Sequence, residues 1–324
     1  MILTDTSETW NRKTRESAAG MKNRAKRTFQ GGVMRLSTLL DVSKEINAIS
    51  LEEMIRPEGF SCSCGKNHAA HLRFLKIGPG AIGQLPELLH SLGARRPMVV
   101  CGPHGYAAAG EAVCEILRQS GFCYSLQCLS EKDGKHIEPS EYAAGSLLLR
   151  FDQSCDLLLG VGSGVINDLC KVLSTTAGIP YMIVATAPSM DGYASDSASV
   201  VIGNIKMSLP KKMPDAILCD TQILSRAPLH MIYAGLGDIL AKHTALFDWK
   251  LSHIVTKEYY CEAVAALFES SLKNTIASLE RFQTHREESV RAITESLVLS
   301  GIGIAFAGCT HPASGLEHYF SNCL

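Results

Sequence analysis

Short strands that alternate with helical patterns constrain the fold of this chain more than any other feature of its sequence. Apolar segments at Pro97–Cys101, Asp156–Val161 and Pro180–Ala185 have the length and composition of interior strands. The first leads through a Gly-Pro-His-Gly turn into the helical pattern of 107–119, and the second leads through a Gly-Ser-Gly turn into the amphipathic pattern of 165–176. This alternation predicts an α/β fold with a mainly parallel sheet and right-handed crossovers.

The strand signals stop after about Arg226. Long helical patterns replace them at 234–255, 258–282 and 286–306. A chain of 324 residues is also long enough for two domains. We therefore predict a Rossmann-like nucleotide-binding domain over 34–225 and an all-helical domain over 226–324, with the active site in the cleft between them.

Residues 1–33 are polar and basic and show little apolar periodicity. We expect a disordered tail or extension here, or an upstream start codon with Met34 as the natural start.

Bulk properties exclude some classes of partner. A net charge of −1 points to neither nucleic acid nor an anionic membrane. No apolar run approaches the roughly 20 residues that a membrane-spanning helix needs, so we expect no stable membrane insertion. The twelve cysteines are scattered and no secretory signal precedes them, which indicates reduced thiols in a cytoplasmic protein.

One cysteine pair lies close to a histidine, in the segment Cys62-Ser-Cys64-Gly-Lys-Asn-His68. It has the form of half a zinc site, but a structural zinc ion needs four ligands and no matching pair stands out elsewhere. We therefore expect a turn between two short strands.

The end of the chain carries a helix signal. Ser314-Gly-Leu-Glu317 has the form of a capping box, with Ser314 as the N-cap. An apolar stripe at helical spacing follows it, made of Leu316, Tyr319, Phe320, Cys323 and Leu324. A helix from Ser314 would have an unfinished apolar face at Leu324, so we expect a truncated chain with an incomplete helical domain.

The segment Gly160-Val-Gly-Ser-Gly164 lies between a predicted strand and a predicted helix. Glycines there let the backbone approach a pyrophosphate, and a helix N-terminus favours negative charge. The pattern is G-x-G-x-G rather than G-x-G-x-x-G, so a tight strand–helix turn explains it equally well. Asn167 and Asp168 follow on the first helical turn, where they suit the helix dipole in either case.

A polar loop, 185–195, follows the next strand at the edge where α/β sheets bind ligands. Thr186, Ser189 and Ser195 supply hydroxyls, and Asp191 supplies a carboxylate for a substrate hydroxyl or amine. A surface turn would also account for the Asp-Gly pair.

Asp238 and His318 are the best candidates for metal ligands. Gly235-Leu-Gly-Asp238 is expected to open a helix, where Asp238 serves as an N-cap or presents its oxygen to a metal ion. His318 lies near the end of the chain, and His243 is a weaker candidate. A catalytic zinc-type ion takes about three protein ligands plus an open position, so this pair alone is incomplete.

Taken together, several segments resemble the glycerol-1-phosphate dehydrogenases, closest to their bacterial branch. That family lies within the superfamily of iron-containing alcohol dehydrogenases and dehydroquinate synthase-like proteins. The resemblance covers roughly residues 55–324 and rests on GSGVINDLCK, ATAPSMDGYAS, GLGDILAK with the downstream Asp248-Trp249, and PASGLEH. The order and long spacing of these motifs make the match far more specific than any one of them.

The resemblance implies a role for each matching residue. An NAD or NADP site would use Gly164, Val165, Ile166, Asn167, Asp168, Thr186, Ser189 and Ser195. Asp191 would contact substrate, and Asp238 would contact both substrate and metal. His318 would be the second metal ligand, and the family's third, a histidine in a His-Gly motif, would follow beyond Leu324. Asn322 stands where the family has a substrate-contacting histidine.

The implied reaction is metal-dependent, NAD(P)H-linked reduction of dihydroxyacetone phosphate, a phosphorylated triose, to sn-glycerol 1-phosphate, a glycerophospholipid precursor. Zn²⁺ or Ni²⁺ would suit the metal site. The resemblance also implies a homodimer in the full-length form. Lys206 is a candidate for the substrate phosphate. The alternatives are a truncated, inactive nucleotide-binding remnant, or a glycerol dehydrogenase or dehydroquinate synthase-like enzyme. The Ser-Met-Asp-Gly loop and Asp248-Trp249 favour glycerol 1-phosphate over the latter two.

Overall fold

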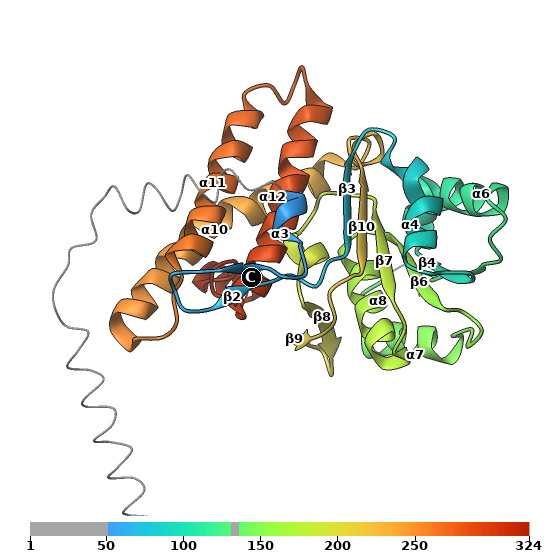
Figure 1. Ribbon diagram of the computed structural model, residues 1–324, viewed down its shortest axis with the longest axis horizontal. Coiled ribbons are helices and arrows are strands. Elements are labelled where there is room, and N and C mark those ends of the chain that lie inside the picture. Colours follow the sequence, from blue (N-terminus) through green and yellow to red (C-terminus); the bar gives the residue numbers. More distant parts are fainter. Residues whose placement is uncertain (1–50, 131–135, 324) are drawn as a thin grey trace, which may run out of the picture. The chain divides into compact units, whose positions relative to one another are not determined.

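Six parallel strands form the central sheet of the computed structural model, which describes residues 51–130 and 136–323 (Figure 1). Their order across the sheet is β3 (Phe74–Gly78), β10 (Ala216–Asp220), β7 (Tyr181–Ala185), β6 (Leu157–Gly162), β4 (Pro97–Cys101) and β5 (Ser125–Cys128). Every neighbouring pair in this order is parallel, which confirms the predicted α/β fold. The predicted extension at 1–33 lies outside the described residues.

The interior strands form because each is an uninterrupted apolar run. All five residues of β4, β7 and β10 and all six of β6 are buried, as expected for strands covered on both faces. The helices of this half are α4 (Leu85–Ser91), α5 (Pro103–Gly105), the π-helical turn η2 (Tyr106–Gly110), α6 (Glu111–Gln119), α7 (Glu141–Leu149) and α8 (Gly164–Ala177).

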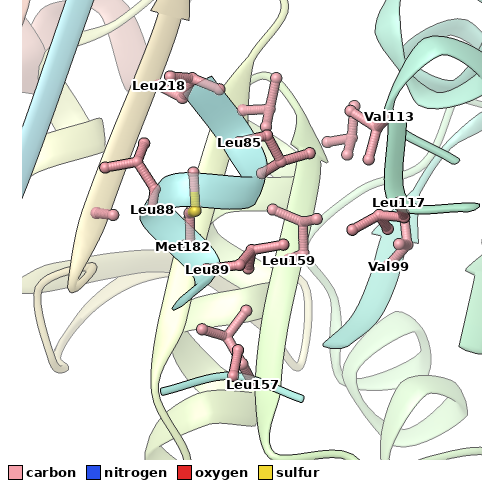
Figure 2. Packing of buried hydrophobic residues seen from close by; sticks show 14 of the residues in the cluster. Leu85, Leu88, Leu89, Val99, Val113, Leu117, Leu157, Leu159, Met182 and Leu218 are labelled. Atoms are coloured by element: carbon pink, nitrogen blue, oxygen red, sulfur yellow. The ribbon is translucent and has the colours of Figure 1, made fainter. Parts of the chain in front are cut away.

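Figure 2 shows the packing of α4 and α6 on the sheet. Leu85 and Leu89 of α4 and Leu117 of α6 are fully buried, together with Leu157 and Leu159 of β6. Burying a leucine side chain stabilises a fold by about 1.5–3 kcal/mol, so this layer holds β6, and with it the turn that follows β6, in place.

Short elements connect these layers. They are α3 (Leu51–Met54), the 3-10 turns η1 (Ala81–Gln84) and η3 (Asp191–Ala194), α9 (Thr221–Leu224) and two antiparallel hairpins. One hairpin pairs β1 (Phe60–Ser61) with β2 (Asn67–His68), and so confirms the predicted turn between short strands. The other pairs β8 (Ser197–Ile202) with β9 (Ile205–Pro210). Gly203 and Asn204 connect them with φ of 56° and 65°, the left-handed pair that a tight hairpin turn requires.

Helices alone follow the last strand. They are α10 (Leu229–Thr256), α11 (Glu262–Leu279), α12 (Arg286–Ala307) and α13 (Leu316–Cys323). The proposed domain boundary at 225 stays a prediction. Among the described residues, α12 is the one helix whose length and apolar composition would suit a membrane span, and 72% of its most apolar window is buried within the protein. That degree of burial is typical of a core helix.

Glycine lets α12 pack closely on the sheet half. A Cβ at Gly301 would lie 2.7 Å from the carbonyl oxygen of Asp191 in η3, and one at Gly303 would lie 2.4 Å from the Phe268 ring of α11. The α12 helix therefore touches both the loop after β7 and its neighbouring helix.

Two predicted helix starts are wrong. The α10 helix begins at Leu229, so Gly235 and Asp238 lie inside it rather than at its N-terminus. The α13 helix begins at Leu316, two residues after the predicted N-cap Ser314. Its first amides are served by other groups: Glu317 Oε1 accepts from Gly315 N at 2.8 Å, and Asp248 Oδ2 accepts from Leu316 N at 2.9 Å.

Candidate active site

The carboxyl ends of β4 and β6 form the switch point of the sheet. The chain runs from β4 outward to β5 and then returns to β6 on the other side of β4, so the two strands lead into loops that diverge. Ligands of open α/β sheets bind in the crevice at such a point. A Cβ at Gly105, after β4, would lie 2.6 Å from the carbonyl oxygen of Val161 in β6. Only glycine allows this approach, and the Gly102–Gly105 turn is a part of the site that sequence reasoning treated as a plain connection.

The predicted glycine turn lies at this edge. Gly162 ends β6 and Gly164 begins α8. The amide of Thr186, directly after β7, donates to the carbonyl of Gly162 at 3.0 Å and so joins the two strand ends. Gly164, Val165 and Thr186 are all partly exposed. The structure thus brings three of the residues predicted for the cofactor to one edge of the sheet.

Other predicted cofactor residues have partners within the protein. Asn167 is fully buried; its amide donates to the carbonyl of Gly192 at 3.1 Å, and its oxygen accepts from the Tyr181 hydroxyl at 2.8 Å. Ile166 is buried as well. Ser195 is 2% exposed, and its hydroxyl donates to the carbonyl of Gly192 at 3.1 Å. Asn167 and Ser195 therefore shape the loop around η3, and direct contact with a cofactor stays a prediction for them, as for Ser189.

Asp168 is the charged member of the predicted cofactor set. Burial raises its pKa to about 6, although the ammonium groups of Lys171 and Lys206 and hydrogen bonds from Ser199 and Asn167 act in the opposite direction. Lys206 lies in β9 and is exposed. Its ammonium favours the ionised form of Asp168, and its role toward a substrate phosphate stays a prediction.

A fully buried lysine, Lys171 of α8, organises the loop. Its ammonium donates to the carbonyls of Gly192, Ser195 and Ser197, the last two at 2.7 and 2.9 Å, and to the Ser195 hydroxyl at 3.0 Å. Burial lowers the pKa of Lys171 to about 8. These acceptors explain how an apolar helix face tolerates a cation. Sequence reasoning missed this residue, for which the only signal was a charge within the buried stripe of α8.

Asp191 of η3 and Asp238 of α10 meet at a second buried cation, Lys242. The Lys242 ammonium lies 2.7 Å from Asp191 Oδ2 and 2.7 Å from Asp238 Oδ1, and it donates to the carbonyl of Ala313 at 2.9 Å. The Lys242 side chain is 3% exposed, whereas the Asp191 and Asp238 side chains are 18% and 15% exposed. The lysine is thus sealed inside while both carboxylates keep a face that a ligand can reach.

Hydrogen bonds and close packing fix the positions of these two carboxylates. The amide of Asp191 donates to Asp238 Oδ2 at 2.8 Å, and the Ser300 hydroxyl of α12 donates to Asp191 Oδ2 at 2.8 Å. A Cβ at Gly235, one turn before Asp238, would lie 1.9 Å from the carbonyl oxygen of Pro188. The glycine inside α10 therefore lets the helix approach the loop closely enough for this hydrogen bond, which is why it does not mark a helix start.

The two carboxyl groups differ in acidity and are strongly coupled. Burial favours the neutral form of Asp191, but the Lys242 ammonium and the Ser300 hydroxyl outweigh it and lower its pKa. Burial and the adjacent Asp191 charge raise the pKa of Asp238, and Lys242 only partly offsets them. Lys242 itself has a raised pKa, because its two carboxylate neighbours outweigh its burial. The pKa of Asp191 is thus lowered and that of Asp238 is raised from the ordinary aspartate value, and a further cation beside the pair would lower the pKa of Asp238.

His318 of α13 faces Asp238. Its Nε2 lies 4.0 Å from Asp238 Oδ1, and its Nδ1 lies 2.7 Å from Glu317 Oε1. A carboxylate on one ring nitrogen is the arrangement that orients a metal-binding histidine, with the other nitrogen directed to the ion. The second Glu317 oxygen, Oε2, is buried and has no hydrogen-bond partner among the described residues.

Asp238 and His318 thus fit as two donors to a divalent cation. They are fewer than the about three protein donors of a catalytic zinc site, and Lys242 also binds the Asp238 oxygen. His243 is exposed. Asn322 lies in α13, and its side chain is outside the described part of the chain.

Comparisons with known proteins show which family the chain is similar to. Residues 76–228 match the family model of the iron-containing alcohol dehydrogenases. The chain is 37% identical over 253 residues to a glycerol-1-phosphate dehydrogenase [NAD(P)+] of Methanothermobacter thermautotrophicus, covering 78% of this chain and 71% of that protein. It is 34% identical over 262 residues to the protein of the same description from Halalkalibacterium halodurans, covering 81% of this chain and 66% of that one. The chain thus spans about two thirds of the length of these relatives.

Solved structures with the same fold are more distant in sequence. A probable glycerol dehydrogenase from Sinorhizobium meliloti aligns with a TM-score of 0.58 at 23% identity, covering 74% of this chain and 66% of that one. A glycerol dehydrogenase from Schizosaccharomyces pombe aligns with a TM-score of 0.58 at 18% identity, covering 74% and 62%. An iron-containing alcohol dehydrogenase from Corynebacterium glutamicum aligns with a TM-score of 0.58 at 18% identity, covering 80% and 67%. They confirm the predicted combination of an α/β sheet with a helical C-terminal part.

Proposed function

Because the chain belongs to the glycerol-1-phosphate dehydrogenase family of the iron-containing alcohol dehydrogenases, we propose that it catalyses NAD(P)H-linked reduction of dihydroxyacetone phosphate to sn-glycerol 1-phosphate. One observation carries the proposal beyond the likeness in sequence. Asp191, from the loop after a sheet strand, and Asp238, from a helix, are joined by one buried ammonium. A substrate bound there would lie between the proposed cofactor turn and the helical part.

The cofactor would bind across the strand ends of β4, β6 and β7. Gly164 and Val165 begin α8, whose first amides point toward that edge and favour a phosphate. Thr186, whose amide donates to the carbonyl of Gly162, would offer its hydroxyl to the same cofactor. The cofactor supplies the hydride, and the protein's part is to hold the reacting carbon against it and exclude water.

The carboxylates would bind the substrate. Asp191 is ionised, because Lys242 and Ser300 stabilise its charge, so it accepts hydrogen bonds from a substrate hydroxyl. Lys242 is not available to the substrate, since its ammonium already serves Asp191, Asp238 and the Ala313 carbonyl. It acts as a positioning residue, because its ammonium lies between the carboxylates of Asp191 and Asp238 and fixes their separation.

A divalent ion, Zn²⁺ or Ni²⁺, would be held by Asp238 and His318 together with a further donor. When bound, it would act as a Lewis acid toward the substrate oxygen. The chain's own contribution is to preorganise the ligands: Glu317 fixes the ring of His318, and the Asp191 amide fixes the carboxylate of Asp238.

Steady-state assays with Zn²⁺ or Ni²⁺ added test this proposal. NADH or NADPH oxidation is followed with dihydroxyacetone phosphate and, separately, with dihydroxyacetone. We expect Asp191→Asn and Asp238→Asn to lower kcat/KM for the phosphorylated substrate at least about 100-fold, a loss of about 2.7 kcal/mol of transition-state stabilisation. Asp196→Asn, an exposed carboxylate two residues after Ala194 of η3, is the matched control and should keep full activity.

Each alternative has its own outcome. Turnover of dihydroxyacetone but not of its phosphate would replace the proposal with a glycerol dehydrogenase. Binding of NADH without turnover of either substrate would leave a nucleotide-binding protein. Equal activity of Asp238→Asn and the control would show that Asp238 takes no part in the reaction.

A further inference from the structure

Four sulfur and nitrogen atoms gather in a group that includes neither Asp238 nor His318. They belong to Cys62, Cys64, His68 and Cys261, and all four lie within 4.8 Å of one another. We call these residues the cysteine–histidine cluster. Cys62 and Cys64 follow β1, His68 ends β2, and Cys261 is the N-cap of α11.

Three separations within the cluster are close to those of a tetrahedral zinc site. The sulfur atoms of Cys62 and Cys261 are 3.6 Å apart, and His68 Nε2 lies 3.4 Å from Cys64 Sγ and 3.5 Å from Cys261 Sγ. With Zn–S of about 2.3 Å and Zn–N of about 2.0–2.1 Å, tetrahedral ligands stand about 3.8 Å (S to S) and about 3.5 Å (S to N) apart. A disulfide needs about 2.05 Å between sulfurs, so Cys62 and Cys261 are placed as two separate ligands.

Backbone hydrogen bonds within the hairpin hold Cys62 and Cys64 in place. The amide of Cys62 donates to the carbonyl of Lys66 and the amide of Gly65 donates to the carbonyl of Cys62, both at 3.0 Å. Gly65 has φ of 87°, in the left-handed region that favours glycine. This tight turn between the second cysteine and the histidine has the form of the short loops that carry zinc ligands.

The surroundings fix the histidine. His68 is 1% exposed, and its Nδ1 lies 2.7 Å from the carbonyl of Phe306. A carbonyl only accepts, so the proton is on Nδ1 and the lone pair of Nε2 faces the thiols. Metal-binding histidines are held in this way, by a hydrogen bond at the other ring nitrogen.

Neighbouring groups suit the negative charge of three thiolates. The Tyr259 hydroxyl lies 3.4 Å from Cys64 Sγ. The Lys66 ammonium lies 3.4 Å from the centre of the Tyr259 ring and donates to the carbonyl of Ala307. Cys261 stands at the N-terminus of an 18-residue helix, where the helix dipole favours a thiolate.

We propose that the cysteine–histidine cluster binds a structural zinc ion that fastens the β1–β2 hairpin to the start of α11. Four protein ligands complete a tetrahedral site and leave no open position, so the ion stabilises rather than catalyses. Three thiolates and one imidazole select Zn²⁺ over Mg²⁺ or Ca²⁺. None of the four residues belongs to the Asp238–His318 pair, so the two metals would be independent.

Metal analysis of the purified chain tests the proposal. We expect about one zinc ion per chain to survive desalting, as a closed site of four protein ligands implies. Cys261→Ser and Cys64→Ser should reduce this to near zero. Cys123→Ser, which removes an exposed thiol, and His318→Ala, which removes a ligand of the other site, should both retain it.

Cobalt substitution gives a second readout on the unaltered chain. Co²⁺ in place of zinc should show thiolate-to-cobalt charge-transfer bands and the visible bands of tetrahedral coordination, and this spectrum decides the matter if the serine variants fail to fold. A wild-type chain without zinc and without these bands would overturn the proposal. A Cys62–Cys261 disulfide in mass spectra of the unreduced protein, or zinc content unchanged in Cys261→Ser, would do so too.

Discussion

Gly235→Ala should separate α10 from the loop after β7, although alanine is the better helix former. The new Cβ would lie 1.9 Å from the Pro188 carbonyl oxygen, where contacts below 3.0 Å essentially never occur, so helix and loop must part by about 1 Å. Such a shift lengthens the 2.8 Å hydrogen bond from the Asp191 amide to Asp238 beyond its range.

The magnitude follows from three contributions. Overpacking costs about 1–3 kcal/mol. Loss of a hydrogen bond to a charged group costs about 1.5–3 kcal/mol. Replacing a glycine inside a helix returns about 1 kcal/mol. We expect a net destabilisation of about 1.5–5 kcal/mol.

Gly237→Ala is the matched control. It lies two residues further along the same helix, and a Cβ there meets nothing within 4 Å. It should stabilise the protein by up to about 1 kcal/mol, because only the helix propensity changes. Urea unfolding followed by circular dichroism measures both variants, and cofactor-dependent activity follows the site. Stabilities of the two variants within about 0.5 kcal/mol of each other would refute the close approach of α10 to Pro188.

Two further changes test the buried charges of α8. Lys171→Met should lower the free energy of unfolding by at least about 3 kcal/mol, since it leaves the carbonyls of Ser195 and Ser197 without this donor. Lys212→Met, which removes an exposed lysine, is the control and should change little. Equal midpoints in urea for the two variants would contradict the role of Lys171. Asp168→Asn should be more stable than the wild type at pH 7, by at most about 3 kcal/mol. The pKa of Asp168 is about 6 in the folded protein against the ordinary value of 3.8. The wild type therefore loses stability as the pH rises from the lower to the higher of these values. Unfolding curves between pH 4 and 8 measure the difference, which should vanish toward pH 4, and a difference independent of pH would exclude ionisation of Asp168 as its cause.

The interior strands of the sheet were predictable from the sequence, because a strand buried on both faces is a continuous run of apolar residues. The β4 and β7 strands are runs of apolar residues, and the sequence places them to within one residue. The edge strands β3 and β5 and the β8–β9 hairpin include exposed positions, and their strand identity depends on partners elsewhere in the chain. Their composition alone does not separate them from loops.

The candidate site also contains some residues that could be predicted from the sequence and some that could not. Asp191, Asp238 and His318 lie in short motifs, so the sequence could single them out as candidates, and their roles stay predictions. Lys242 and Lys171 were missed, because a buried ammonium is tolerated only through acceptors that the fold brings from other segments, such as Ala313 for Lys242. Spacing within a helix shows neither those acceptors nor the depth of burial.

The cysteine–histidine cluster shows where spacing rules fail in principle. Three of its members lie within a seven-residue segment, while Cys261 is 193 residues from His68 and has no second ligand beside it. A search for two pairs of zinc ligands in the sequence therefore misses the site and predicts only a turn. Yet β1 and β2 have only two residues each, and a hairpin that short is not stable alone. Its described anchors include the edge contact of Phe60 with Phe306, the buried ring of His68 and the hydrogen bond from Lys66 to the carbonyl of Ala307. A hairpin this short, held with its thiols directed at a helix N-terminus, is therefore better explained by a bound ion than by its own hydrogen bonds.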